Sequence, residues 1–164
     1  MKVLDLLPGQ KIIKKALETV VMPARLELIL KDRRYLLDSA HNEDSARALV
    51  RAVKKIYRYN KLVTVVGIVK GKDTAGILKN LASVSDSLIV TQPVTHKELD
   101  TEYVYRTARQ LFPAAVLKKK LDEAIAYACE LSAGEDLILI TGSFYTTSPA
   151  RSLITGKVIS LDGT

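Results

Sequence analysis

Short apolar runs alternate along this chain with segments of helical periodicity, and this alternation restricts the fold more than any other feature. The runs are rich in Val, Ile and Leu and predict strands at residues 35–37, 62–69, 87–91, 114–117 and 137–141. Between them, apolar residues recur every three or four positions, as at Ala46, Leu49, Val50, Val53 and Tyr57 and again at Leu121, Ala124, Ile125 and Ala128. This order predicts repeated strand–helix–strand units.

The runs are apolar at consecutive positions, which indicates strands that are covered by helices on both sides. We therefore expect an α/β fold with a Rossmann-like, doubly wound, mostly parallel sheet and helices on both faces. Residues 26–30 are expected to pair with residues 35–38 through the polar turn at 31–34, which places an antiparallel hairpin at one edge of the sheet.

The chain divides into three predicted parts. Residues 1–22 are expected to form a helix that connects to an upstream domain, because they end ahead of Pro23. Their helical spacing is carried by Ile12, Ile13, Ala16, Leu17 and Val20. Residues 23–154 contain the alternating pattern and are expected to form one domain, whereas residues 155–164 show little periodicity and are expected to be a tail.

Composition bounds the compartment and the ligands. The 164 residues are 48% hydrophobic and 26% charged, the balance of a globular chain, and no apolar run approaches the roughly 20 residues of a membrane span. The start lacks a secretory pattern, and the single cysteine, Cys129, is interpreted as a small core residue. We therefore expect a cytoplasmic protein. Its formal net charge of +7 predicts attraction of anions such as nucleotides, folate-like polycarboxylates or nucleic acid.

The polar segment Asp38-Ser39-Ala40-His41-Asn42 lies between a predicted strand and a predicted helix. In open α/β sheets, ligands bind beyond the carboxyl ends of the strands, so the side chains of Asp38, His41 and Asn42 are expected to point into that crevice. The alternative is that Asn42 caps the helix and His41 is a surface residue.

The segment Lys70-Gly71-Lys72-Asp73 follows the next strand and superficially resembles a phosphate loop. It is not a Walker A sequence, because only three residues separate Gly67 from Gly71 and Asp73 stands where a magnesium-binding Ser or Thr is needed. Lys72 is a candidate ligand contact. The alternative is a strand-to-helix turn with solvated lysines, in which Asp73 is the helix N-cap.

Two further segments carry polar residues at expected loop positions. Gly142-Ser143-Phe144-Tyr145 follows the last strand and places a hydroxyl at a predicted helix N-terminus, where an anionic group would fit. The G-x-S-x-G pattern of serine hydrolases is absent, so Ser143 is interpreted as a binding residue or a cap. Arg25 could offer its planar guanidinium to a phosphate, or it could be a surface arginine beside Glu27.

The two histidines, His41 and His96, lie on separate predicted loops without metal-ligand spacing. We therefore expect no metal site in this chain, and His96 is interpreted as a rim residue.

Taken in order, these segments resemble the C-terminal domain of folylpolyglutamate synthase and dihydrofolate synthase, within the Mur ligase superfamily. The family's P-G-R-x-E, D-G-A-H-N, K-D and G-S-F/L-Y resemble residues 23–27, 38–42, 72–73 and 142–145, and the similarity runs from about residue 12 to residue 153. Ala24 and Ser39 stand where the family motifs have glycine.

The resemblance implies an ATP-dependent amide ligase that adds glutamate to a folate or pteroate carboxylate through an acyl phosphate. It implies catalytic roles for Arg25 and His41, ATP contacts from Arg25, Asp38, Asn42 and Lys72, and glutamate contacts from His41 and Ser143. The family's phosphate loop and Mg²⁺ ligands belong to an N-terminal ATPase domain, which would be the partner of this chain. The segment alone is therefore expected to be catalytically incompetent.

Two other interpretations stay open at this point. One is a Mur-type ligase domain that acts on a cell-wall precursor, since the Asp38–Asn42 pattern is shared widely in the superfamily. The other is a non-catalytic module that binds nucleotides or nucleic acid, suggested by the basic pI and the run Lys118-Lys119-Lys120. The absence of Trp and the presence of only two Phe leave little for base stacking, so neither nucleic acid nor a membrane is the expected partner.

Overall fold

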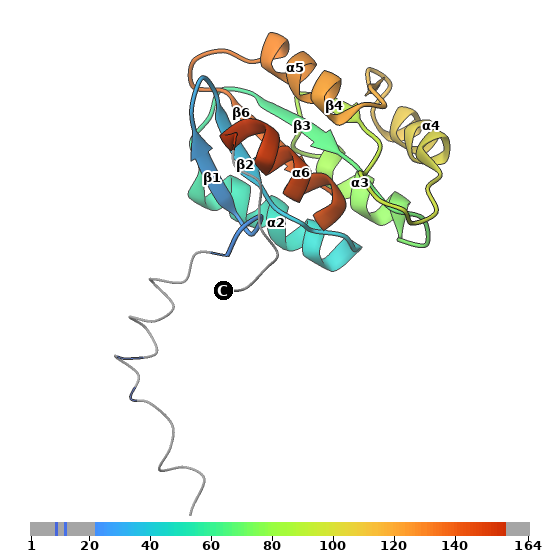
Figure 1. Ribbon diagram of the computed structural model, residues 1–164, viewed down its shortest axis with the longest axis horizontal. Coiled ribbons are helices and arrows are strands. Elements are labelled where there is room, and N and C mark those ends of the chain that lie inside the picture. Colours follow the sequence, from blue (N-terminus) through green and yellow to red (C-terminus); the bar gives the residue numbers. More distant parts are fainter. Residues whose placement is uncertain (1–8, 10–11, 13–21, 157–164) are drawn as a thin grey trace, which may run out of the picture.

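A computed structural model of this chain describes Gly9, Ile12 and residues 22–156. The predicted connecting helix and nearly all of the predicted tail lie outside the described residues. The strands are β1 (Glu27–Leu30), β2 (Arg34–Leu37), β3 (Leu62–Val66), β4 (Ser87–Val90), β5 (Val116–Leu117) and β6 (Leu137–Thr141). The helices are α2 (Glu43–Ile56), α3 (Thr74–Ala82), α4 (Thr101–Leu111), α5 (Leu121–Leu131) and α6 (Phe144–Thr155) (Figure 1). Among these helices none has the length and apolar character that crossing a membrane requires.

One sheet with the strand order β1-β2-β6-β3-β4-β5 runs through the molecule (Figure 1). β1 pairs antiparallel with β2, and every other neighbouring pair is parallel. The predicted edge hairpin is therefore confirmed, although Arg34 belongs to β2 rather than to the turn. The last strand, β6, lies between β2 and β3 in the sheet, although both of these strands are far from it in the sequence.

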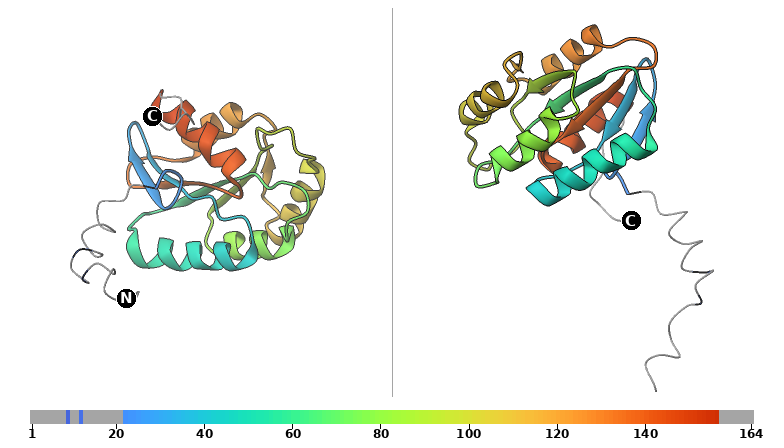
Figure 2. Two further views of the ribbon diagram at one scale, coloured as in Figure 1. Left: turned by 60° about the horizontal axis from the view of Figure 1, so that its bottom comes forward. Right: turned by 180° about the vertical axis from the view of Figure 1, so that it is seen from behind.

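Helices cover both faces of the sheet, as the uninterrupted apolar runs predicted. α2, α3 and α4 pack on one face and α5 and α6 on the other (Figure 2). Successive side chains of a strand point to opposite faces, so Leu36 joins the first layer while Tyr35 and Leu37 join the second. The doubly wound α/β fold is confirmed.

Three elements differ in detail from the sequence predictions. β3 ends at Val66 although the apolar run continues to Val69; Ile68 and Val69 are buried outside the strand, which explains why the run is apolar. β5 has only two residues. α4 was not predicted, because its buried positions include two threonines and one alanine and therefore give a weak apolar signal: Thr101, Val104, Thr107 and Ala108.

The caps of α2 and α3 fix the loops at the carboxyl edge of the sheet. Asn42 Oδ1 accepts a hydrogen bond from the Ser45 N–H at 2.8 Å, and Ser45 Oγ accepts one from the Asn42 N–H at 3.1 Å. Asp73 Oδ1 accepts from the Gly76 N–H at 2.9 Å. Both caps, which the sequence offered as alternatives to ligand contact, are therefore present. The helices begin close together, since a Cβ added to Gly76 would lie 2.9 Å from the Cγ of Glu43.

Candidate functional site

Arg25 sits at the centre of a tight turn that leads into β1. Its two neighbours, Ala24 and Leu26, are the non-glycine residues with positive φ in the described part of the chain, at 57° and 46°. The left-handed region costs a residue with a Cβ about 1–2 kcal/mol, so this turn persists only if its surroundings hold it. The family motif has glycine where this chain has Ala24, and the positive φ gives the physical reason for that glycine.

Asp38 provides some of the contacts that stabilise the Arg25 turn. Its Oδ2 accepts a hydrogen bond from the Leu26 N–H at 3.0 Å and its Oδ1 accepts one from the Ala40 N–H at 2.9 Å. The Ser39 N–H also donates to the Ala24 carbonyl at 2.9 Å. The carboxylate thus ties the Arg25 turn to the loop that follows β2.

Glu27 provides further contacts that stabilise the Arg25 turn. Its Oε2 accepts a hydrogen bond from the Ala24 N–H at 2.8 Å, and both carboxylate oxygens accept from the Arg151 Nε, at 2.8 and 3.1 Å. The side chains of this pair are 13% and 22% exposed, which limits screening by water. Arg151 lies on α6, so the turn is braced from a helix 124 residues away in sequence. No sequence signal pointed to Arg151.

Arg25 and His41, the two residues to which the resemblance assigns catalytic roles, line the same cavity. This cavity, named here the Arg25 cavity, has a volume of about 420 Å³ and is lined by Met22, Pro23, Arg25, Ser39, His41 and Phe144. Phe144 opens α6, and the positive end of the helix dipole therefore adds to the guanidinium charge. The combination suits an anionic ligand.

The imidazole of His41 has a defined orientation. Its Nδ1 lies 3.0 Å from the Ser39 carbonyl oxygen, and a carbonyl can only accept, so Nδ1 carries the proton. In the neutral ring the other nitrogen, Nε2, is then the acceptor. His41 can therefore accept a hydrogen bond or a proton from a ligand.

Burial raises the pKa of the Asp38 carboxyl above its ordinary value. The backbone hydrogen bonds from Leu26 and Ala40 and the positive charge of Arg25 act in the opposite direction without cancelling that effect. The predicted contact between Asp38 and ATP stays a prediction. Both oxygens already accept a backbone N–H, although a carboxylate has further lone pairs to offer.

Ser143 is the N-cap residue of α6, at the helix N-terminus predicted for it, but the residue is only 3% exposed and its side chain makes no capping hydrogen bond. Thr146 Oγ1 donates its proton to the Gly67 carbonyl at 3.0 Å, so the 3.0 Å contact between the two hydroxyls has Ser143 as the donor. The hydroxyl chain joins the loops that follow β6 and β3. Gly142, at φ 104°, completes this junction, since a Cβ there would lie 2.5 Å from the Gly67 carbonyl oxygen.

Asn42 and Lys72 lie on the same edge of the sheet but do not line the Arg25 cavity. Asn42 is exposed and its Oδ1 caps α2, whereas Lys72 is an exposed residue just before α3. Their predicted ATP contacts stay predictions. Ser39, the second departure from the family motifs, is buried without a positive φ, so a side chain is tolerated there.

Within residues 22–156, Gly9 and Ile12, no group of three or more His, Cys, Asp or Glu side chains could hold a metal ion. Cys129 is half-buried, and its Sγ lies 3.1 Å from the Tyr35 hydroxyl. His96 is exposed and lies on the loop between β4 and α4.

Comparisons with known proteins agree with the motif order. The family model described as Mur ligase, glutamate ligase domain, matches residues 24–144. The chain is 32% identical over 144 residues to the dihydrofolate synthase/folylpolyglutamate synthase of Buchnera aphidicola subsp. Acyrthosiphon pisum, covering 88% of this chain and 34% of that protein. It is 30% identical over 156 residues to the protein of the same name from Mycobacterium tuberculosis, covering 86% and 32%.

Solved structures give the same answer for the fold. Mycobacterium tuberculosis folylpolyglutamate synthase complexed with ADP superposes with a TM-score of 0.83 at 30% identity, covering 90% of this chain and 36% of that one. The folylpolyglutamate synthase of Thermotoga maritima superposes with a TM-score of 0.76 at 27% identity. The chain spans about a third of the length of these relatives.

Proposed function

The chain belongs to the glutamate ligase domain family of the Mur ligases, and from this premise we propose that it supplies one half of an ATP-dependent ligase that adds glutamate to a folate or pteroate carboxylate. In this reaction the γ-phosphoryl group of ATP passes to the carboxylate and ADP leaves. The amine of glutamate then attacks the acyl phosphate, an amide bond forms, and inorganic phosphate and a proton are released.

The observation that carries the proposal is that Arg25 and His41 line one cavity at the α6 N-terminus, where Nδ1 of His41 is engaged and Nε2 is the acceptor. The transferring phosphoryl group and the acyl phosphate are anionic, so the guanidinium of Arg25 would stabilise both. His41 Nε2 would accept a proton from the incoming ammonium group and leave the amine free to attack. We assign catalytic roles to these two residues.

The remaining predicted residues have supporting roles in this proposal. Asp38 holds the Arg25 turn and offers its spare lone pairs to the nucleotide, with Asn42 and Lys72 as further contacts at the same edge. Ser143 is buried, so we propose that it serves the glutamate side chiefly by fixing the loop after β6. Residues 23–154 would form the ligase domain and residues 1–22 the connection to its partner.

The partner in this proposal is an N-terminal ATPase domain that carries the phosphate loop and the ligands of Mg²⁺. The folylpolyglutamate synthase of Mycobacterium tuberculosis was solved in complex with ADP, which supports a nucleotide as a ligand of the complete ligase. Closure of the two domains would bring Arg25 to the phosphates and exclude water.

The test is coupled ATP hydrolysis with a folate acceptor and glutamate, first with this chain alone and then with the chain mixed with an upstream ATPase domain. We expect turnover only in the mixture. His41→Ala should lower the rate by about 10²- to 10⁴-fold, while the matched variant of the exposed histidine, His96→Ala, should stay within about twofold of the parent. Equal losses in both variants, or none in either, would refute the assignment of His41.

A further inference from the structure

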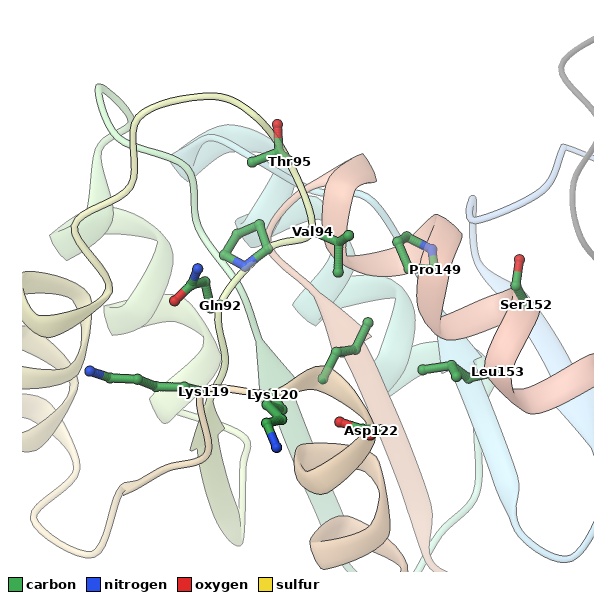
Figure 3. Close-up of a pocket in the computed structure, with 11 residues that line it drawn as sticks. Gln92, Val94, Thr95, Lys119, Lys120, Asp122, Pro149, Ser152 and Leu153 are labelled. Carbon is green, nitrogen blue, oxygen red and sulfur yellow. The ribbon is translucent and has the colours of Figure 1, made fainter.

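A second and larger cavity lies at the carboxyl ends of β4 and β5 and shares no lining residue with the Arg25 cavity. Its volume is about 770 Å³, within the range of small-molecule sites. Three segments form its walls (Figure 3): the loop at 92–95, the start of α5 at 119–122, and α6 with Pro149, Ser152 and Leu153. It is named here the α5–α6 pocket.

Backbone hydrogen bonds hold these walls together. Pro149 has no N–H to donate to the carbonyl of Tyr145 one turn earlier, and that carbonyl instead accepts from the Val94 N–H at 2.9 Å. The loop is thus fastened to α6 at the position where the proline leaves an acceptor open. The Gln92 N–H donates to the Lys119 carbonyl at 3.1 Å and fastens the same loop to the start of α5. The pocket is therefore preformed.

The interior of the pocket is apolar. Val94 and Leu153 are 58% and 55% exposed and point toward the same space from two different walls (Figure 3). Pro93 and Leu121 are buried beside them. Withdrawal of apolar surface from water is favourable, so a flat apolar ligand between these side chains would be stabilised.

The rim of the pocket is polar and carries both charges. Gln92 offers an amide that donates and accepts, Asp122 offers a carboxylate, and Lys119 and Lys120 stand at the start of α5. The lysines pair with Glu102 at 2.8 Å and Glu123 at 3.1 Å, neither of which lines the pocket. All four of these side chains are more than half exposed, so water screens both pairs and makes them weak. The ammonium groups can therefore turn to a ligand at small cost.

We propose that the α5–α6 pocket binds a planar heteroaromatic anion, with the ring between Val94 and Leu153 and the anionic group beside Lys119 and Lys120. The ring edge would be recognised by the Gln92 amide and the Asp122 carboxylate, which match a heterocycle that has both N–H donors and acceptors. A pteridine with a carboxylate tail and a nucleobase with a phosphate share this chemistry. The inference is independent of the proposed function.

The test is titration of the ¹⁵N-labelled full chain with three probes, followed by amide NMR. Folic acid carries the pteridine, AMP carries the nucleobase, and p-aminobenzoylglutamate carries the folate tail without the heterocycle. We expect folic acid or AMP to shift the amides of Thr95, Leu121 and Ser152 saturably, and whichever binds identifies the source. The tail alone should bind at least about tenfold more weakly, which corresponds to about 1.4 kcal/mol.

A matched pair of variants locates the site. Leu153→Asp places a charge against the apolar wall and should weaken binding at least about tenfold. Leu131→Asp changes an exposed leucine at the far end of α5 that does not line the pocket, and should leave affinity within about twofold. Both positions are exposed, so the fold should tolerate both changes. The proposal is overturned if no probe shifts the pocket amides, if the tail alone binds as well, or if the two variants behave alike. Shifts confined to Arg25, His41 and their neighbours would overturn it while supporting the proposed function.

Discussion

The Arg25 cavity and the α5–α6 pocket lie along the same edge of one sheet, yet they are built in opposite ways. The first rests on two residues with positive φ, a buried carboxylate and an ion pair that reaches across to α6. The second has an apolar interior, and its walls are held by ordinary backbone hydrogen bonds between loops and helices. Under the proposed function, the strained and braced turn positions Arg25 for catalysis, whereas a pocket that only binds a ligand needs shape and an apolar surface.

This contrast predicts that substitutions in the loops around the Arg25 cavity lower the free energy of unfolding more than equivalent substitutions elsewhere in the domain. The largest effect is expected for Gly142→Ala. Gly142 combines a φ of 104° with a carbonyl 2.5 Å from the added Cβ, so the free energy of unfolding should fall by about 3 kcal/mol or more. Gly134→Ala, at φ 49° with open space around it, should cost only about 1 kcal/mol. Chemical denaturation compares the two, and equal losses would remove the distinction.

A smaller effect is expected when the bracing ion pair is broken. Glu27→Gln should lower the free energy of unfolding by about 1–3 kcal/mol, because it weakens a partly buried pair and the hydrogen bond to Ala24. Glu102→Gln, which removes the charge of an exposed pair with Lys119, is the matched control and should cost less than about 0.5 kcal/mol. Hydrogen exchange at the Ala24 and Leu26 amides should accelerate only in the first variant. Unchanged exchange there would show that Glu27 does not brace the turn.

The smallest expected effect concerns the protonation of the Asp38 carboxyl. The pKa of Asp38 should lie above the ordinary aspartate value of 3.8 because burial disfavours its charge. Between 3.8 and that raised pKa the native protein keeps a proton that the unfolded chain has released, so the contribution of Asp38 to stability falls as pH rises through this window. Carboxyl ¹³C titration measures the midpoint. Arg25→Gln should raise the pKa further, since the guanidinium lowers it; a drop would contradict the placement of Arg25 beside Asp38.

The Asp38–Asn42 loop, the edge hairpin and the two helix caps could be predicted from the sequence, because each depends on residues within a few positions of one another. The ion pair between Glu27 and Arg151 could not be predicted, because 124 residues separate the two partners in sequence. The α5–α6 pocket could not be predicted for the same reason. Its apolar residues Val94, Leu121 and Leu153 are far apart in sequence, and only the fold brings them together. α4 was missed because threonine occupies half of its four buried positions.

The central place of β6 has a consequence for how the chain acquires its structure during synthesis. β2 and β3 both pair with β6, and neither pairs with the other. Until residues 137–141 emerge from the ribosome, two apolar strands therefore stay unmatched along the edges that will meet in the middle of the sheet. Contacts of such long sequence separation slow folding, so the growing chain remains open to aggregation until nearly all of the domain has been made.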